Sequence, residues 1–205
     1  MYLQNNPPEL FQYNQSTFQA FYFFKNVFLD SVLVEPDDWA ATFNCKKWNE
    51  DSTSCVILGR CVGARKWDTS ICGNGVCDLP AMGDGADGKI ETIGYLKPSE
   101  YPVFLIYDKS TGAYYSTNTE GDVQLQEDVC KNGYPYCYEW QNYSFFIIEK
   151  LNGVEIYMDC MGKLGGDKVL DECGICGGYG PQYTCKKTGI SYCIEAMYQM
   201  DCPLE

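Results

Sequence analysis

The apolar positions of residues 1–153 recur in short runs that are typical of β-strands. Residues 18–24 are dense in aromatic side chains, which are enriched in strands, and both faces of this run are apolar. A strand with two apolar faces is expected inside a sandwich rather than at an exposed edge. We expect residues 27–34 to pair with it. Further short strands are predicted at residues 39–43, 61–67 and 143–148.

Turn signals divide the rest of this region. Residues 103–107 and 113–117 flank Asp108-Lys109-Ser110-Thr111-Gly112, which predicts a hairpin with glycine where a positive φ is needed. Residues 90–95 are expected to be extended. Helical periodicity is weak, and only residues 194–200 predict a short helix. Several short strands with frequent turns predict an all-β fold, an antiparallel β-sandwich.

The composition changes after the last predicted strand. Residues 154–205 hold six of the 13 cysteines, many glycines and little apolar mass. We therefore divide the chain into an extended N-terminal arm at 1–15, a β-sandwich at 16–153 and a small disulfide-rich module at 154–205. The module has too few apolar residues to form a core of its own, so cross-links are expected to hold it together.

Thirteen cysteines and no histidine limit the chemistry of this chain. The absence of histidine removes Ser-His-Asp and Cys-His catalysis and every histidine-liganded metal site. No particular pair stands out among the 28 acidic residues, so we predict neither an enzyme nor a cofactor. The net charge of −13 disfavours nucleic acid and anionic membranes.

The N-terminal residues carry no basic or apolar stretch typical of a signal peptide, and no run is long enough for membrane insertion. Abundant cysteine nevertheless indicates an oxidising environment. Either a signal peptide was removed, or oxidation occurs without secretion. Large DNA viruses that encode their own thiol oxidase assemble disulfide-bonded particles in the cytoplasm, and such a particle satisfies both observations.

Two segments of the C-terminal module share a frame. Residues 159–166, DCMGKLGG, and residues 171–178, DECGICGG, each contain an acidic residue, a cysteine, a glycine and a Gly-Gly pair. They resemble the DCxGxCGG and DECGxCGG repeats of extracellular and large-virus proteins. Leu164 stands where that pattern has cysteine. We interpret this departure as the origin of the odd cysteine count.

The central stretch carries a second resemblance. The segments VGARKWD at 62–68, CGNGVCD at 72–78, MGDG at 82–85, GYL at 94–96 and YPVFLIYD at 101–108 resemble a β-sandwich module. Such modules occur beside DECGxCGG repeats in marine bacterial surface proteins and algal-virus proteins. The resemblance implies an extracellular or virion module and brings no catalytic residues.

The cysteine spacing predicts where disulfides form. Cys72 and Cys77 enclose Gly-Asn-Gly, and Cys130 and Cys137 enclose Asn-Gly-Tyr-Pro, so each pair brackets a turn and is expected to close locally. Two of Cys45, Cys55 and Cys61 are expected to pair. In the C-terminal module we expect disulfides at Cys173, Cys176, Cys185, Cys193 and Cys202. The alternative is zinc bound by the first four of these as thiolates.

An acidic loop is a candidate calcium site. Asp78, Asp84 and Asp87 supply the oxygen ligands that hard cations take, although EF-hand spacing is absent and a plain acidic turn is the alternative. The glycines at 83, 85 and 88 match a phosphate-binding pattern. We reject that reading because Asp84 and Asp87 would repel phosphate.

These observations predict a non-enzymatic structural component of a virus particle, a minor capsid or surface protein of a large DNA virus. Its partners would be other capsid or surface proteins. Residues 1–13 are expected to lie extended on a neighbouring subunit. The alternative is an adhesin or glycan-binding module on a viral fibre or cell surface. Its platform for a host glycan would be Trp39, Trp48, Trp67 and Trp140. We favour instead the interpretation that these aromatic residues pack the sandwich core and protein interfaces. A third reading is a zinc-stabilised intracellular protein.

Overall fold

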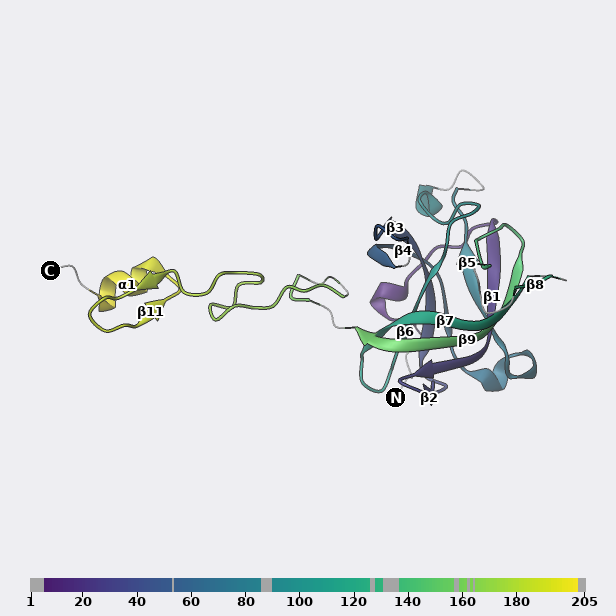
Figure 1. Cartoon of the computed structure of the whole chain (residues 1–205), viewed down its shortest axis with the longest axis horizontal. Coiled ribbons are helices and arrows are strands. Elements are labelled where there is room, and N and C mark those ends of the chain that lie inside the picture. The colour runs from purple at the N-terminus through teal and green to yellow at the C-terminus, as the bar shows by residue number, and fades with distance from the viewer. Residues whose placement is uncertain are drawn as a thin grey trace. The chain divides into compact units, whose positions relative to one another are not determined.

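A computed structural model describes residues 6–52, 54–85, 90–125, 128–130, 137–156, 159–161, 163 and 165–202. The chain divides into two compact units, Met1–Glu155 and Ile156–Glu205, close to the boundary predicted at residue 153. Strands dominate the first unit (Figure 1). Three disulfides cross-link the second unit. The prediction of an all-β fold with a disulfide-rich C-terminal part is confirmed.

The first unit is built on one curled sheet of nine strands. They are β1 Gln19–Leu29, β2 Val32–Leu33, β3 Trp39–Trp48, β4 Cys55–Lys66, β5 Cys77–Met82, β6 Val103–Tyr107, β7 Tyr114–Leu125, β8 Asp128–Cys130 and β9 Phe145–Ile156. The order is β2-β1-β9-β7-β6-β3-β4, with β5 also pairing β1 and β8 pairing β7. Among the described residues, short 3-10 helices precede or separate these strands: η1 Glu9–Phe11, η2 Thr69–Ile71, η3 Gly73–Gly75 and η4 Ile90–Thr92.

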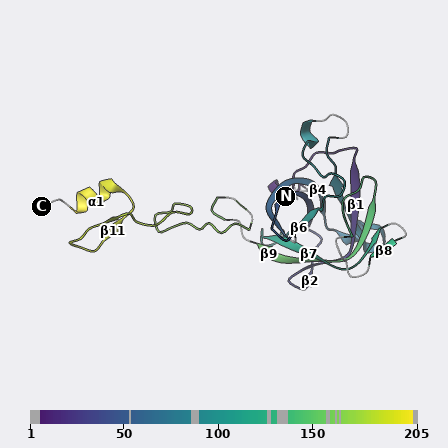
Figure 2. The same ribbon diagram turned by 45° about the horizontal axis from the view of Figure 1, so that its top comes forward.

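One pairing departs from the antiparallel expectation. Strands β1 and β9 run parallel, with Phe21 opposite Phe145 and Tyr22 opposite Phe146, and they lie side by side in both views (Figures 1 and 2). A tight hairpin forces antiparallel pairing, but the long chain between Leu29 and Phe145 leaves the direction free. The sheet is therefore mixed.

The burial of β1 alternates along the strand. Ala20, Tyr22 and Phe24 are buried, and the Tyr22 ring stacks on Phe146 at 4.6 Å between centroids. Phe21 and Phe23 point the other way and are only partly covered. The expectation that both faces of residues 18–24 are buried was wrong, because only one face of β1 meets the core.

The sheet curls until β4 lies against β5. A Cβ added at Gly63 in β4 would sit 1.8 Å from the carbonyl oxygen of Pro80 in β5, so the two backbones touch where glycine has no side chain. Pro80 fits this place because β5 pairs with β1 only, and proline is tolerated on an edge strand. The contact closes the structure around the core.

Several local predictions are corrected. Residues 27–29 continue β1, and only Val32–Leu33 pairs back after a turn with positive φ at Asp30 and Ser31. The segment expected to be extended at 90–95 contains the 3-10 turn η4. Strand β5 was not predicted. The hairpin at residues 108–112 forms as expected, with Gly112 at φ +77°.

The N-terminal segment packs on its own chain. Phe11 is completely buried and makes edge-to-face contacts with Phe43, Tyr107 and Tyr114 at 5.7–6.4 Å. The Asn14 amide donates to the Tyr95 hydroxyl at 2.9 Å. The expectation that this arm lies on a neighbouring subunit is therefore wrong for residues 6–13, because the partner groove is supplied within the same domain. Residues 1–5 lie outside the described residues.

The second unit is held by short elements and cross-links. Strands β10 Tyr183–Thr184 and β11 Ser191–Tyr192 form a two-stranded ribbon beside helix α1 Glu195–Asp201, which matches the predicted helix within one residue. Tyr183 and Tyr192 both contact Tyr198 of α1. In the described part of the chain, none of the helices has the length and apolar character needed to span a bilayer.

Candidate functional site

The outer side of β1 and β9 carries a group of partly exposed aromatic rings. Phe21 and Phe23 leave the sheet on the side away from the core, and Phe145 of β9 lies directly opposite Phe21. Phe145 is 52 % exposed, and its ring stacks on Phe21 with centroids 5.8 Å apart. Ile147 lies opposite Phe23 on the same side. We call Phe21, Phe23, Phe145 and Ile147 the aromatic face.

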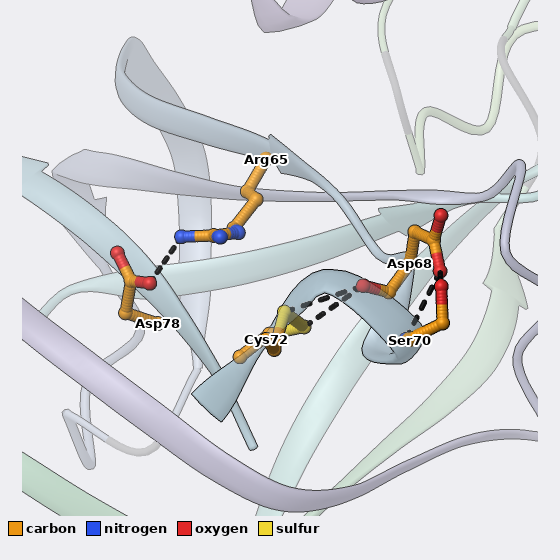
Figure 3. Close-up of a disulfide and its surroundings, with 6 residues drawn as sticks. Arg65, Asp68, Ser70, Cys72 and Asp78 are labelled. Carbon is orange, nitrogen blue, oxygen red and sulfur yellow. Dashed lines mark hydrogen bonds and ion pairs between the residues drawn. A yellow bond between two sulfur atoms is a disulfide. The ribbon is translucent and has the colours of Figure 1, made fainter. Parts of the chain in front are cut away.

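An ion pair borders the aromatic face on the β5 side. Asp78 of β5 lies opposite Phe23, and its carboxylate pairs with the guanidinium of Arg65 on β4 (Figure 3). The two charges neutralise each other, so this border adds no net charge although the chain carries −13. On the β5 side the aromatic face therefore meets a neutralised ion pair and no net charge.

A disulfide fixes the loop that leads into this border. Cys72 and Cys77 are bonded, and the Asp68 carbonyl oxygen lies 3.3 Å from Cys72 Sγ (Figure 3). The Asp68 carboxylate accepts hydrogen bonds from the Ser70 hydroxyl and amide, and these bonds lower the pKa of Asp68. The loop is thus held from both ends, which positions Asp78 at the start of β5.

A pocket of about 410 Å³ opens next to the start of β1. Its apolar walls are Phe18, Leu96, Pro98 and Trp140, and its polar groups are Asp84, Lys97 and Asn142. Phe18 is 38 % exposed, whereas Trp140 is almost fully buried and its indole N–H donates to the Ala81 carbonyl at 2.9 Å. An exposed ring and a fixed ring therefore line the same hollow.

Hydrogen bonds tie the walls of this pocket to one another. The Gly83 amide donates to the Phe18 carbonyl at 2.7 Å, and the Asp84 amide donates to the Leu96 carbonyl at 2.9 Å. The Gln19 amide donates to Asn142 Oδ1 at 3.0 Å. Gly83 has no room for a side chain, since a Cβ there would lie 2.5 Å from the Trp140 ring. The pocket is therefore preformed.

The disulfides follow the predicted pattern in the first unit. The structure pairs Cys72 with Cys77 and Cys130 with Cys137, which are the two local pairs that the turn sequences predict. Of the three neighbouring cysteines, Cys45 and Cys55 are bonded. The remaining one, Cys61, is a buried free thiol. Burial raises its pKa to about 12, so it is protonated and unreactive in the folded chain.

The C-terminal cysteines are all paired. The bonds are Cys160–Cys176, Cys173–Cys193 and Cys185–Cys202, so the four residues of the zinc alternative belong to three different disulfides and do not form a set of thiolates. The set of C-terminal disulfide cysteines predicted from the sequence did not include Cys160. The sequence-based interpretation also ascribed the odd cysteine to the missing cysteine at Leu164, which was wrong because the unpaired residue, Cys61, lies in the β-domain.

The structure does not gather the calcium candidates at one site. Asp78 pairs with Arg65, whereas Asp84 accepts the Gly94 amide at 2.9 Å and lies 3.4 Å from the Lys97 ammonium. Each carboxylate thus has its own protein partner. Asp87 lies outside the described residues.

The four tryptophans do not form one platform. Trp67 and Trp140 are buried, and Trp67 packs beside Phe24 in the core. Trp48 contacts Tyr101 at the far end of β3. The aromatic surface on the outer side of β1 and β9 is made of phenylalanine instead. The alternation along β9 could have indicated an exposed aromatic side, but the apolar residues 143–148 are equally typical of a core strand.

Searches against family models, curated proteins and solved structures found no match to this chain.

Proposed function

We propose that this protein is a non-enzymatic structural component of a virus particle, a minor capsid or surface protein of a large DNA virus that acts through contacts with other capsid or surface proteins. The observation that carries the proposal is the aromatic face. Phe145 is 52 % exposed, and Phe21 and Phe23 beside it are partly exposed on the same side of the sheet.

The chemistry of the aromatic face fits an apolar protein partner. The centres of protein interfaces are enriched in aromatic residues and depleted in charge. Here the stacked Phe21–Phe145 pair has Ile147 beside it and the neutralised Arg65–Asp78 pair at its border. Phenylalanine has no polar group to hydrogen-bond sugar hydroxyls, so the matching occupant of this face is the apolar surface of a neighbouring protein.

The cross-links fit a role outside a reducing environment. Six disulfides join 12 of the 13 cysteines. The two cysteines of each pair are separated by 5 to 20 positions in the sequence. Bridges of this kind stabilise a fold by about 2–4 kcal/mol each, chiefly by restricting the unfolded chain. Such reinforcement, together with the resemblance of the DECGICGG segment to large-virus repeats, supports placement on a particle.

The test is incorporation of a variant with a polar aromatic face. Phe145→Ser removes the most exposed ring of the aromatic face and leaves the core untouched, so thermal unfolding should stay near that of the native chain. Loss of a central aromatic contact should lower incorporation into particles about tenfold. The matched control is Ile90→Ser, which changes a 79 % exposed apolar residue outside the face. Normal incorporation of Phe145→Ser would refute the proposal.

A further inference from the structure

We infer that the pocket between Phe18 and Asn142 binds a neutral pyranose sugar. This inference is independent of the proposed function, because it concerns a different surface from the aromatic face. The pocket has the shape, the balanced charge, the remaining hydrogen-bonding groups and the preformed walls that such a ligand requires.

The apolar walls suit the C–H face of a sugar ring. Phe18 offers an exposed aromatic ring, and Leu96 and Pro98 extend the apolar wall next to the edge of Trp140. Small-molecule sites are typically concave and mostly apolar, with a few polar groups that set orientation, and their volumes begin near 300 Å³. A pocket of about 410 Å³ is thus large enough for one pyranose ring.

The charge of the pocket selects a neutral ligand. The Asp84 carboxylate lies 3.4 Å from the Lys97 ammonium, so the two formal charges cancel. The Asp84 carboxylate would repel a phosphate or carboxylate ligand, and the Lys97 ammonium would repel a cationic ligand. Neutral hydroxyl groups can instead donate to the carboxylate and accept from the ammonium without disturbing the balance.

The polar side chains are held in place yet keep capacity for a ligand. Asn142 Oδ1 accepts the Gln19 amide, which fixes the side chain and leaves its NH2 group as a donor beside the pocket. Asp84 uses one carboxylate oxygen for the Gly94 amide and retains further acceptor positions. A carboxylate, an amide donor and an ammonium around one apolar wall form the donor and acceptor set that vicinal hydroxyls require.

The pocket is organised before a ligand arrives. The Ser99 amide donates to the Trp140 carbonyl at 3.1 Å, and the Trp140 amide donates to the Glu100 carbonyl at 2.8 Å. Together with the bonds at Phe18, Asp84 and Gln19 described above, they join the pocket walls through backbone atoms. A preorganised site loses little conformational entropy on binding. Small ligands that make few contacts, such as single sugars, can therefore bind to it.

The experiment is an NMR titration of the ¹⁵N-labelled chain with D-glucose, D-galactose, D-mannose, N-acetylglucosamine and their common disaccharides. At least one sugar should shift the Trp140 indole N–H and the Asn142 side-chain amide in a saturable manner, with a Kd of about 1 mM or tighter. N-acetylneuraminate serves as the anionic probe. Absence of saturable shifts at Trp140 with every sugar, or binding of the anionic probe alone, would overturn the inference.

Variants separate this site from the aromatic face. Phe18→Ala removes the exposed aromatic wall and should weaken binding at least about tenfold. Asn142→Asp keeps the acceptor for the Gln19 amide but removes the NH2 donor, so the fold should persist while sugar binding falls. Phe145→Ala is the matched control, an exposed phenylalanine outside the pocket, and should bind sugar like the native chain. If Phe18→Ala and Asn142→Asp bind as tightly as the native chain, the assigned pocket is wrong.

Discussion

Asp159 and Asp171 occupy equivalent positions in two turns of the C-terminal unit. Asp159 Oδ1 accepts the amides of Met161 and Lys163, and Asp171 Oδ1 accepts those of Cys173 and Ile175. The Asp159 amide donates to the Lys163 carbonyl, and the Asp171 amide donates to the Ile175 carbonyl. The two segments with a shared sequence frame therefore share a conformation, in which an aspartate side chain organises the turn that the disulfides then lock.

The Asp171 turn should respond to acid. Hydrogen bonds from the amides of Ile175, Gly180 and Cys173 lower the pKa of the Asp171 carboxyl. Because the folded pKa lies below the unfolded value of about 3.9, this stabilisation is complete above that value and is lost as the pH falls through the folded pKa. Acidification below about pH 4 should move the amide resonances of Ile175 and Gly180 in the NMR spectrum.

Two variants control the acid response. Asp171→Asn should abolish the pH dependence of the Ile175 and Gly180 amides, because its side chain has no proton to gain in this range. Asp167→Asn makes the same change of charge in the same unit and should leave the response intact. Amides that are indifferent to pH in the native chain would contradict the role given to Asp171.

Phe11 should anchor the N-terminal segment. Its ring is buried among Phe43, Tyr107 and Tyr114, so Phe11→Ala leaves a cavity at that place. The free energy of unfolding should fall by about 3–5 kcal/mol in denaturant titrations. Gln12→Ala, an exposed neighbour, should change it little. A Phe11→Ala chain of native stability would show that the segment is held elsewhere.

Gly63 should be intolerant of any side chain. In Gly63→Ala the new Cβ meets the Pro80 carbonyl oxygen, and a backbone atom cannot move aside as a flexible side chain can. Separation of β4 from β5 should cost at least about 2 kcal/mol of unfolding free energy. Gly73→Ala adds a Cβ with nothing within 4 Å and serves as the matched control. Equal stability of the two variants would rule out the close contact.

The cysteine inventory should be visible by thiol counting. With six disulfides and 13 cysteines, one thiol remains, that of Cys61. The native chain at neutral pH should show almost no reactive thiol, because Cys61 is buried and protonated. Denaturation without reductant should release one reactive thiol per chain, and Cys61→Ala should release none. Several reactive thiols in the native chain would contradict the pairing.

The sequence predicts the all-β class because short apolar runs and turn residues determine strands and turns through neighbouring positions in the chain. The hairpin at 108–112 and the disulfides at Cys72–Cys77 and Cys130–Cys137 were foreseen, since each depends on residues close in the chain. The outward side of β1 was not foreseen. A run such as Ala20-Phe21-Tyr22-Phe23 is apolar at every position, so it does not reveal which face meets the core.

Contacts between distant segments were beyond prediction for the same reason. The pocket joins Phe18 to Asn142, and the close approach joins Gly63 to Pro80, with no local pattern marking either pair. Phe11 was assigned to a partner because a short Pro-rich segment cannot bury a ring by itself. The groove that receives it is built from three strands whose packing the sequence does not encode locally.

Mass spectrometry of purified particles, digested without reductant, tests the particle location and the cross-linking together. We expect this chain to be present, with its peptides joined through the six pairs of the structure, including Cys160–Cys176 and Cys173–Cys193. Absence of the chain from the particles, or its presence there with these cysteines reduced, would refute the proposed capsid role.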